Sequence, residues 1–244
     1  MIIVYILLFF LLFVVIYMTC LQKESYESPE LIHILTRTGT RETCFRRLKK
    51  SLELQRYSQY KHIISNDNKH NRYLEKEKYV VPVQKEKKIF EWICPYEKYL
   101  NELCKVADGW IIFMDDDAKF IDSKFLYKLG QLCKRTSKDK VIIFRIYFGK
   151  EKNIRPVTSS LKIGLDLFRE NSDKKHWIDM ASICIHSSLL KKYPFTKLCG
   201  GDMLLVKRLE RDGVPIIVDK KLPIGIWANS DGSAKGKDIV CGDI

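Results

Sequence analysis

Short apolar runs recur along most of the chain, and segments with helical spacing separate them. The strand-like runs are Leu31–Leu35, His62–Ser65, Trp110–Met114, Val141–Phe144 and Val214–Val218. Apolar runs of this length, bounded by polar or turn-forming residues, are typical of buried β-strands. Because strands that alternate with helices usually form a parallel sheet, the pattern predicts an α/β domain with a mostly parallel central sheet and helices on both faces.

The segments between these runs show the features of helices and loops. Thr40 is a plausible N-cap for a helix that carries Phe45, Leu48 and Leu52 on one face. Helical spacing also relates Tyr96, Tyr99, Leu100 and Leu103. A further helix is expected from about Asp202 to Gly213, since glycine commonly follows the last turn of a helix. Residues 66–90 are charged and broken in pattern, which predicts a loop with short elements at most.

The N-terminal segment Met1–Leu21 is almost wholly apolar and carries no charged side chain. About 20 apolar residues suffice for a helix that crosses a bilayer. A cleaved signal peptide is the alternative, but a basic n-region and a small-residue cleavage site are both missing. We therefore expect a retained anchor at residues 1–21, a polar stalk at 22–30 and one domain at 31–244. The basic residues after the anchor give a small preference for a cytosolic domain, and the side of the membrane is left open.

Composition narrows the class of protein. The 244 residues include 46% hydrophobic and 30% charged residues, which excludes a mainly disordered or fibrous chain. The formal net charge of +13 suits a polyanionic ligand or an anionic membrane surface, although solvated lysines are the default explanation. The eight cysteines have no metal-ligand spacing, and several lie in apolar runs, where cysteine is commonly a small buried side chain.

Three consecutive aspartates follow one of the apolar runs directly. Trp110–Met114 predicts a buried strand that leads into Asp115, Asp116 and Asp117. Neighbouring carboxylates repel one another unless a cation compensates, and ligands of open α/β sheets bind at the carboxyl ends of strands. Asp115 and Asp117 could share a divalent cation, which prefers oxygen ligands. A solvated turn or a helix cap is the alternative.

Three weaker motifs also carry polar side chains that suit a site. Gly200 and Gly201 would let the backbone approach a ligand closely, and Asp202 would place a carboxylate at the N-terminus of a helix. A plain N-cap is the alternative. Ser65–Asn68 could contact a nucleoside or form a turn. Ala234–Asp238 places two lysines in a glycine-containing loop that suits phosphate, or forms a solvated basic tail.

Taken in order, these motifs resemble those of GT-A glycosyltransferases, specifically the family-two-like enzymes of bacteria and large DNA viruses. The matching segments are Ile34–Thr38, Arg41 with Phe45, Ser65–Asp67, Tyr96–Asn101, Gly109–Asp117, Gly201–Asp202 and Gly236–Asp238. The resemblance spans roughly residues 31–239, and the triple aspartate is its most specific element. It implies a Rossmann-like nucleotide-sugar-binding fold and a divalent metal, Mn²⁺ or Mg²⁺, at a DxD motif.

The resemblance also implies roles for individual residues. Asp202 matches the catalytic base of inverting members. The metal ligands are expected to be Asp115, Asp117 and Asp238. The donor-binding residues are expected to be Thr36, Arg37, Arg41, Asp67, Asn101, Asp115, Asp116, Lys235 and Lys237. The expected partners are a nucleotide-sugar donor, with a UDP-sugar favoured, a glycan, protein or lipid acceptor, and the membrane, with no specific nucleic acid.

The chain also departs from the family pattern. Glu97 stands where relatives often carry Asn, and Gly201 replaces the acidic residue that commonly precedes the base. The late histidine that many relatives add to the metal is missing, since the last histidine is His186. Two alternatives therefore stay open: a membrane-tethered binding protein with a degenerate transferase fold, and a sugar nucleotidyltransferase. The second would normally have a glycine-rich basic loop after the first strand, where this chain has one glycine, Gly39.

Overall fold

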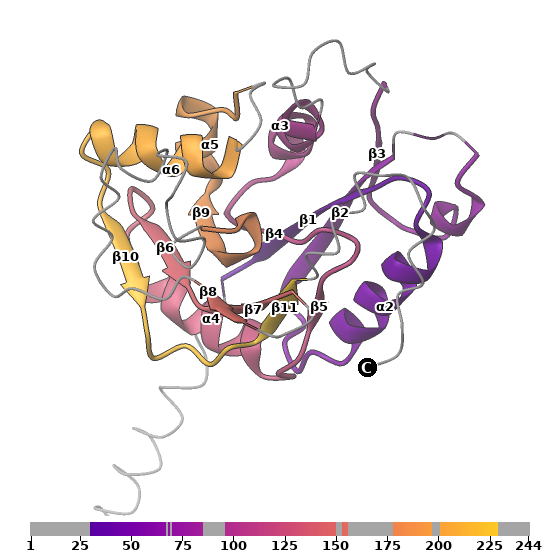
Figure 1. Cartoon of the computed structure of the whole chain (residues 1–244), viewed down its shortest axis with the longest axis horizontal. Coiled ribbons are helices and arrows are strands. Elements are labelled where there is room, and N and C mark those ends of the chain that lie inside the picture. The colour runs from indigo at the N-terminus through magenta and orange to yellow at the C-terminus, as the bar shows by residue number, and fades with distance from the viewer. Residues whose placement is uncertain are drawn as a thin grey trace, which may run out of the picture.

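The computed structural model describes residues 30–66, 68, 70–84, 96–149, 153–155, 178–196 and 201–228. In these ranges the chain forms a seven-stranded sheet and a four-stranded sheet with helices packed around them (Figure 1). No helix within the same ranges has the length and apolar character needed to cross a bilayer. The expected anchor at residues 1–21 lies outside the described residues and stays a prediction, as does nearly all of the stalk.

The large sheet has the strand order β10-β6-β9-β4-β1-β2-β3. Its strands are β1 (Ile32–Thr38), β2 (Tyr60–Asn66), β3 (Val80–Pro82), β4 (Trp110–Phe113), β6 (Val141–Phe144), β9 (Ile183–His186) and β10 (Ile216–Asp219). All neighbouring pairs are parallel except those of β9, which runs antiparallel to both β4 and β6. The expected mostly parallel sheet is therefore confirmed, and β9 is a strand that the sequence pattern did not predict.

Strand β1 is longer than the apolar run that predicted it. Its backbone continues to pair with β2 through Thr36–Ile64, Arg37–Ser65 and Thr38–Asn66. The polar side chains at the end of β1 hide this extension from a hydropathy pattern. The extension matters for the site, because it fixes the backbone of Arg37 and Thr38 in the sheet.

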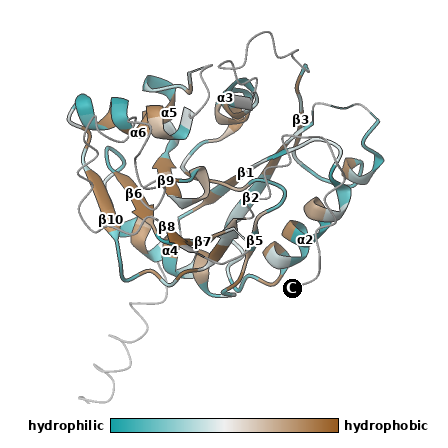
Figure 2. Ribbon diagram, viewed as in Figure 1, coloured by the Kyte–Doolittle hydropathy of each residue, from teal (hydrophilic) through white to brown (hydrophobic). Residues whose placement is uncertain are grey.

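Helices cover both faces of the large sheet, as expected. They are α2 (Glu42–Glu53), α3 (Tyr96–Val106), α4 (Phe125–Arg135), α5 (Ser187–Lys192) and α6 (Gly201–Arg211), and the 3₁₀ turns are η1 (Arg72–Leu74) and η4 (Met180–Ser182). Trp110 and Ile112 of β4 face a core formed with α2 and α4. Ile111 and Phe113 face the other core, formed with α3, α5 and α6. Side chains that alternate between two buried faces explain why β4 and β6 consist of apolar residues alone. Strand β6 is brown in Figure 2 for this reason.

The start of α2 corrects one prediction. The helix begins at Glu42, and Arg41 occupies the N-cap position without a side-chain capping hydrogen bond, so Thr40 is not the cap. The expected apolar face is present, because Phe45, Leu48 and Leu52 are all buried. The guanidinium of Arg41 pairs with carboxylates of the site instead, as described below.

A second, smaller sheet was not predicted from the sequence. It has the order β5-β11-β7-β8, with β5 (Lys119–Phe120), β7 (Ile146–Phe148), β8 (Asn153–Arg155) and β11 (Ile226–Ala228). Strands of two or three residues give almost no periodic signal. The pairing of β11 with β5 brings the last described strand next to the segment that follows the triple aspartate.

Candidate active site

The triple aspartate emerges at the carboxyl edge of the large sheet. β4 pairs in parallel with β1 as far as Leu35 and Phe113, and the Met114 N–H then donates to the Leu35 carbonyl at 2.9 Å. Asp115 to Asp117 therefore lie beside the polar end of β1. This edge is where open α/β sheets bind their ligands.

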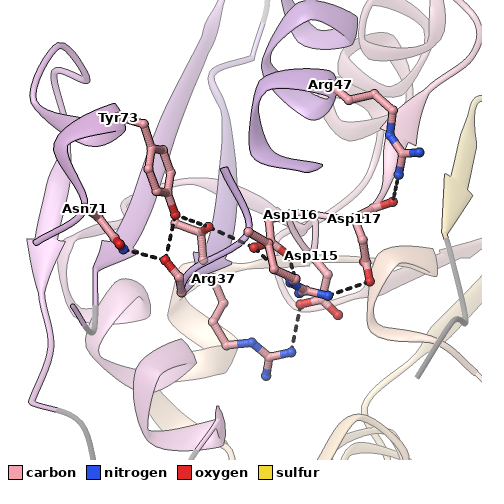
Figure 3. Close-up of polar contacts among 10 residues, drawn as sticks. Arg37, Arg47, Asn71, Tyr73, Asp115, Asp116 and Asp117 are labelled. Atoms are coloured by element: carbon pink, nitrogen blue, oxygen red, sulfur yellow. Dashed lines mark hydrogen bonds and ion pairs between the residues drawn. The ribbon is translucent and has the colours of Figure 1, made fainter. Parts of the chain in front are cut away.

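The three aspartates point in different directions (Figure 3). The side chain of Asp115 is 51% exposed, that of Asp117 is 14% exposed and that of Asp116 is completely buried. The outer two are therefore available to a ligand. Because the Asp116 side chain is enclosed in the protein in this structure, the expectation that it contacts a donor directly is not supported.

Arginines from β1 and α2 balance part of this negative charge. Arg37 Nη2 lies 3.1 Å from Asp115 Oδ1. Arg41 forms an ion pair with Asp116, and its Nη1 donates to Asp117 Oδ2 at 2.9 Å. Burial lowers the pKa of Arg41, but the three aspartates outweigh this effect and the pKa is raised. Arg47 Nη2 donates to the backbone carbonyl of Asp117, as Figure 3 shows.

A hydrogen-bond network fixes the loops after β1 and β2 against each other. The Thr38 hydroxyl donates to Asp116 Oδ2 at 2.8 Å and lies 3.0 Å from the Tyr73 hydroxyl. Tyr73 and the Asn71 amide both donate to the Gly39 carbonyl, at 2.7 and 2.5 Å (Figure 3). The network links the aspartates to Asn71 and Tyr73, which follow the segment where the resemblance predicts a nucleoside contact.

Two more aspartates approach the same edge from the other side of β4. Because β9 is antiparallel to β4, the turn that precedes β9 lies at the carboxyl end of β4. Asp179 caps this turn, and its Oδ1 accepts the Ala181 N–H at 2.8 Å. Asp202 lies in the first turn of α6, where it accepts hydrogen bonds from the backbone N–H groups of Met203, at 2.8 Å, and Met180.

The carboxylates of the site raise one another's pKa values. Burial is the largest cause for Asp117, and Asp115 adds to it. Burial, followed by Asp202, Asp115 and Asp117, raises the pKa of Asp179 to about 7. Burial and Asp115 likewise raise the pKa of Asp202. Residues far apart in the sequence therefore form one acidic cluster, in which a bound cation would relieve the repulsion.

The donor set fits a hard divalent cation with few protein ligands. Asp115 and Asp117 offer carboxylate oxygens, which Mg²⁺ and Mn²⁺ prefer. Among the described residues, no three acidic, histidine or cysteine side chains converge closely enough to hold a metal by themselves. The arrangement therefore suits a cation that takes its remaining ligands from phosphate oxygens and water.

Two of the expected donor contacts have other partners. Thr36 is fully buried, and its hydroxyl lies 2.9 Å from Nε2 of His62, whose pKa burial lowers to about 3. The Asn101 amide donates to the Phe195 carbonyl and accepts the Phe195 N–H, both at 2.9 Å. The Thr36 side chain is enclosed in the protein, so direct contact with a donor is not supported for it. Asn101 is partly exposed, and its donor-binding role stays a prediction.

Four expected site residues lie outside the described residues, so their roles stay predictions. Asp67 follows β2, and Lys235, Lys237 and Asp238 follow β11. No feature of the sequence pointed to Arg47 or Tyr73, which act through backbone and hydroxyl contacts. The position of Asp179 at this edge follows from the direction of β9, a strand that the sequence pattern did not predict.

The comparisons with known proteins bear on the fold. No protein-family model matches the sequence, and no curated protein matches it. The solved structures that match include Staphylococcus aureus TarS 1-349 in complex with UDP-GlcNAc, with 15% sequence identity and a TM-score of 0.59 over 86% of this chain and 62% of that chain. The mannosyltransferase PcManGT from Pyrobaculum calidifontis, in complex with GDP-Man and Mn²⁺, matches with 9% identity and a TM-score of 0.54 over 80% and 56% of the two chains.

The chain thus spans about 60% of the length of these TarS and mannosyltransferase structures. At such low identity the likeness concerns the arrangement of the elements. The central sheet, with its mostly parallel strands and the aspartates at its carboxyl edge, agrees with the resemblance drawn from the sequence motifs. The chain has the GT-A-like fold of these glycosyltransferases.

Proposed function

We propose that this chain is a membrane-anchored glycosyltransferase that moves a sugar from a nucleotide-diphosphate donor to an acceptor hydroxyl, with inversion at the anomeric carbon. The observation that carries the proposal is that Asp115, Asp117 and Asp202 lie at one edge of a GT-A-like sheet, with Asp115 near enough to the other two to raise their pKa values. Solved structures of this fold hold UDP-GlcNAc or GDP-Man with Mn²⁺, which supports a nucleotide-sugar donor here.

The donor end of the site consists of the two outer aspartates and the cations near them. Asp115 and Asp117 would hold Mn²⁺ or Mg²⁺, which would neutralise charge on the diphosphate leaving group. Arg37, which is partly exposed, is close enough to Asp115 to face a phosphate at the same place. Lys235 and Lys237 are proposed to add positive charge from the C-terminal segment.

The acceptor end depends on Asp202. Burial raises the pKa of this carboxyl, which makes its ionised form a stronger base. Asp202 takes the proton of the acceptor hydroxyl while the acceptor oxygen bonds to the anomeric carbon. The bond from that carbon to the diphosphate oxygen breaks, and the electron pair leaves with the nucleoside diphosphate.

A second candidate function is donor or glycan binding without turnover. It is favoured by the ion pair between Arg41 Nη1 and Asp117 Oδ2, at 2.9 Å, because an arginine in this position already compensates a carboxylate that a metal would use. A divalent ion would have to compete with this contact. Binding of donor without release of nucleoside diphosphate would identify this function.

The test is a donor panel with the full-length protein in detergent. UDP-, GDP- and dTDP-sugars are each incubated with Mn²⁺ or Mg²⁺, or with EDTA, and release of nucleoside diphosphate is measured with and without acceptor sugars. Asp117→Asn serves as the site variant. Asp139→Asn serves as the matched control, because Asp139 is exposed and precedes β6 at the opposite, amino edge of the sheet.

The proposal expects metal-dependent release that Asp117→Asn abolishes and Asp139→Asn leaves unchanged. Calorimetric titration with UDP and Mn²⁺ is expected to lose its binding signal in Asp117→Asn alone. If the two variants behave alike, the assignment of the metal pair is wrong. If no donor is turned over although UDP binds with Mn²⁺, the binding protein replaces the transferase as the function.

A further inference from the structure

A buried carboxyl that the proposed mechanism does not use lies beside its base. Glu97 is the second residue of α3, and only 7% of it is exposed. Its Oε2 atom is buried and has no hydrogen-bond partner among the described residues. An unsatisfied buried carboxyl oxygen costs stability, so a side chain of this kind calls for a functional explanation.

Glu97 packs directly on the backbone of Gly201, the first residue of α6. A Cβ atom at Gly201 would lie 2.6 Å from Glu97 Cγ and 2.9 Å from Glu97 Oε1, so no side chain fits there beside the glutamate. The Glu97 carboxylate also accepts the Gly201 N–H. Because Gly201 has no side chain, space is left at the first turn of α6, and the side chain of Glu97 from α3 occupies it.

The charges around Glu97 connect it to Asp202. Burial raises the pKa of Glu97 to about 7, the Gly201 N–H and Arg37 of β1 oppose the rise, and Asp202 of α6 adds to it. The two carboxyls are therefore close enough to influence each other. Glu97 touches the helix turn that carries the base, and none of its described contacts is with an outer aspartate of the triple motif.

We propose that Glu97 is a positioning residue for Asp202. It holds the first turn of α6 through Gly201 and supplies a second carboxyl beside the base, from α3 rather than from α6 itself. This inference rests on the proposed function insofar as Asp202 is the base. It adds that the activity depends on Glu97 and Gly201 together, because the Glu97 side chain occupies the space that a side chain at position 201 would need.

The test uses full-length variants that separate packing, charge and position. Glu97→Gln keeps the shape and removes the charge, and Glu97→Ala removes both. Glu97→Ala combined with Gly201→Glu returns a carboxyl to the same space from the α6 side. Glu97→Ala combined with Gly201→Gln is its matched uncharged control.

Three readouts are taken for each protein: kcat and KM for the donor, affinity for UDP with Mn²⁺, and hydrogen exchange of the first amides of α6. We expect Glu97→Gln to lower kcat about 10- to 100-fold, because the carboxyl beside Asp202 is lost. UDP affinity and melting temperature are expected to stay close to those of wild type, because the contact with Gly201 is kept. Glu97→Ala is expected to exchange faster at the start of α6. The Gly201→Glu double variant is expected to regain kcat, and the Gly201→Gln control is not.

Unchanged kcat in Glu97→Gln, or equal rates in the two double variants, would overturn the positioning role. Unchanged hydrogen exchange at the first amides of α6 in Glu97→Ala would also overturn the positioning role. This measurement does not require that the protein turn over a donor. If the proposed function is wrong, wild type releases no nucleoside diphosphate. The hydrogen-exchange measurement at the start of α6 still shows whether Glu97 holds this helix.

Discussion

The ion pair between Arg41 and the buried Asp116 offers a sharp test of how the site is stabilised. The Asp116 side chain is completely buried, and its oxygens contact Arg41 and the Thr38 hydroxyl. Burial raises the pKa of Asp116, and Arg41 and Thr38 oppose the rise. We predict that Arg41→Met destabilises the protein at alkaline pH, because it leaves a buried carboxyl without its cation.

The size of the effect can be bounded in two ways. Breaking a buried ion pair by removing one partner typically costs about 3–5 kcal/mol. Asp116 can instead bind a proton. Because burial already raises the pKa of Asp116 to about 7 in wild type, this proton adds little cost near pH 7 and about 1.4 kcal/mol for each pH unit above it. Arg41 is partly exposed, which reduces the loss, so we expect a small loss near pH 7 and about 3 kcal/mol at pH 9.

The same reasoning fixes the pH dependence. In wild type the pKa of Asp116 is already raised to about 7, and loss of Arg41 raises it further. Above pH 7 the folded variant therefore keeps a proton that wild type has released, and its stability falls relative to wild type as the pH rises. The difference between Arg41→Met and wild type is therefore expected to be smallest near pH 6, where Asp116 is protonated in both folded proteins, and to grow from pH 7 toward pH 9.

Urea unfolding followed by circular dichroism measures these free energies. The matched control is Arg46→Met, because Arg46 lies in the same helix, is exposed and pairs with Glu42 at the surface, which predicts a loss below about 0.5 kcal/mol. Asp116→Asn added to Arg41→Met should restore part of the stability, because no buried charge is left. The reasoning would be refuted if Arg41→Met resembled the Arg46 control at pH 9, or if its effect were the same at pH 6 and pH 9.

Four further predictions concern single features. Asp179→Asn should raise the melting temperature relative to wild type at pH 8 but not near pH 4, because burial and its acidic neighbours raise the pKa of Asp179 to about 7 and ionisation then destabilises the fold. Gly225→Ala should cost about 1–3 kcal/mol in urea unfolding, because its Cβ would lie 2.1 Å from the ring of the buried Phe125. Asp202→Asn should slow sugar transfer about 10²- to 10⁴-fold while UDP affinity holds, and equal loss of both would mean a structural role. If residues 1–21 are a retained anchor, the full-length protein should stay in membranes after a carbonate wash, and mass spectrometry should find these residues intact.

The pattern of the sequence determined the class of fold and its central strands. Val141–Phe144 was predicted with the observed bounds, and the strand before the triple aspartate was one residue too long. Both strands are buried on two faces, so every residue is apolar and the run is easy to recognise. The strands of the second sheet could not be predicted, since two or three residues carry too little periodic signal. In β9 the apolar run is only three residues long and ends at His186, so it carries little more.

For the site, the sequence identified the charged residues that directly follow a buried strand. The aspartates after Phe113 stood out because a buried run leads directly into like charges. Their separation into two outward side chains and one buried anchor depended on Arg41, which is 75 positions away from Asp116. A partner at such a distance in sequence becomes visible only when the sheet brings the ends of β1 and β4 together.

Tertiary structure alone decided which carboxyls share one site. Asp179 belongs to it because β9 runs antiparallel between two parallel neighbours, which places the start of β9 at their carboxyl ends. Glu97 meets Gly201 because α3 and α6 pack on the same face of the sheet. Sequence specifies local chemistry through residue type and period, whereas the distances between charges, and hence their pKa values, follow from strand order and direction.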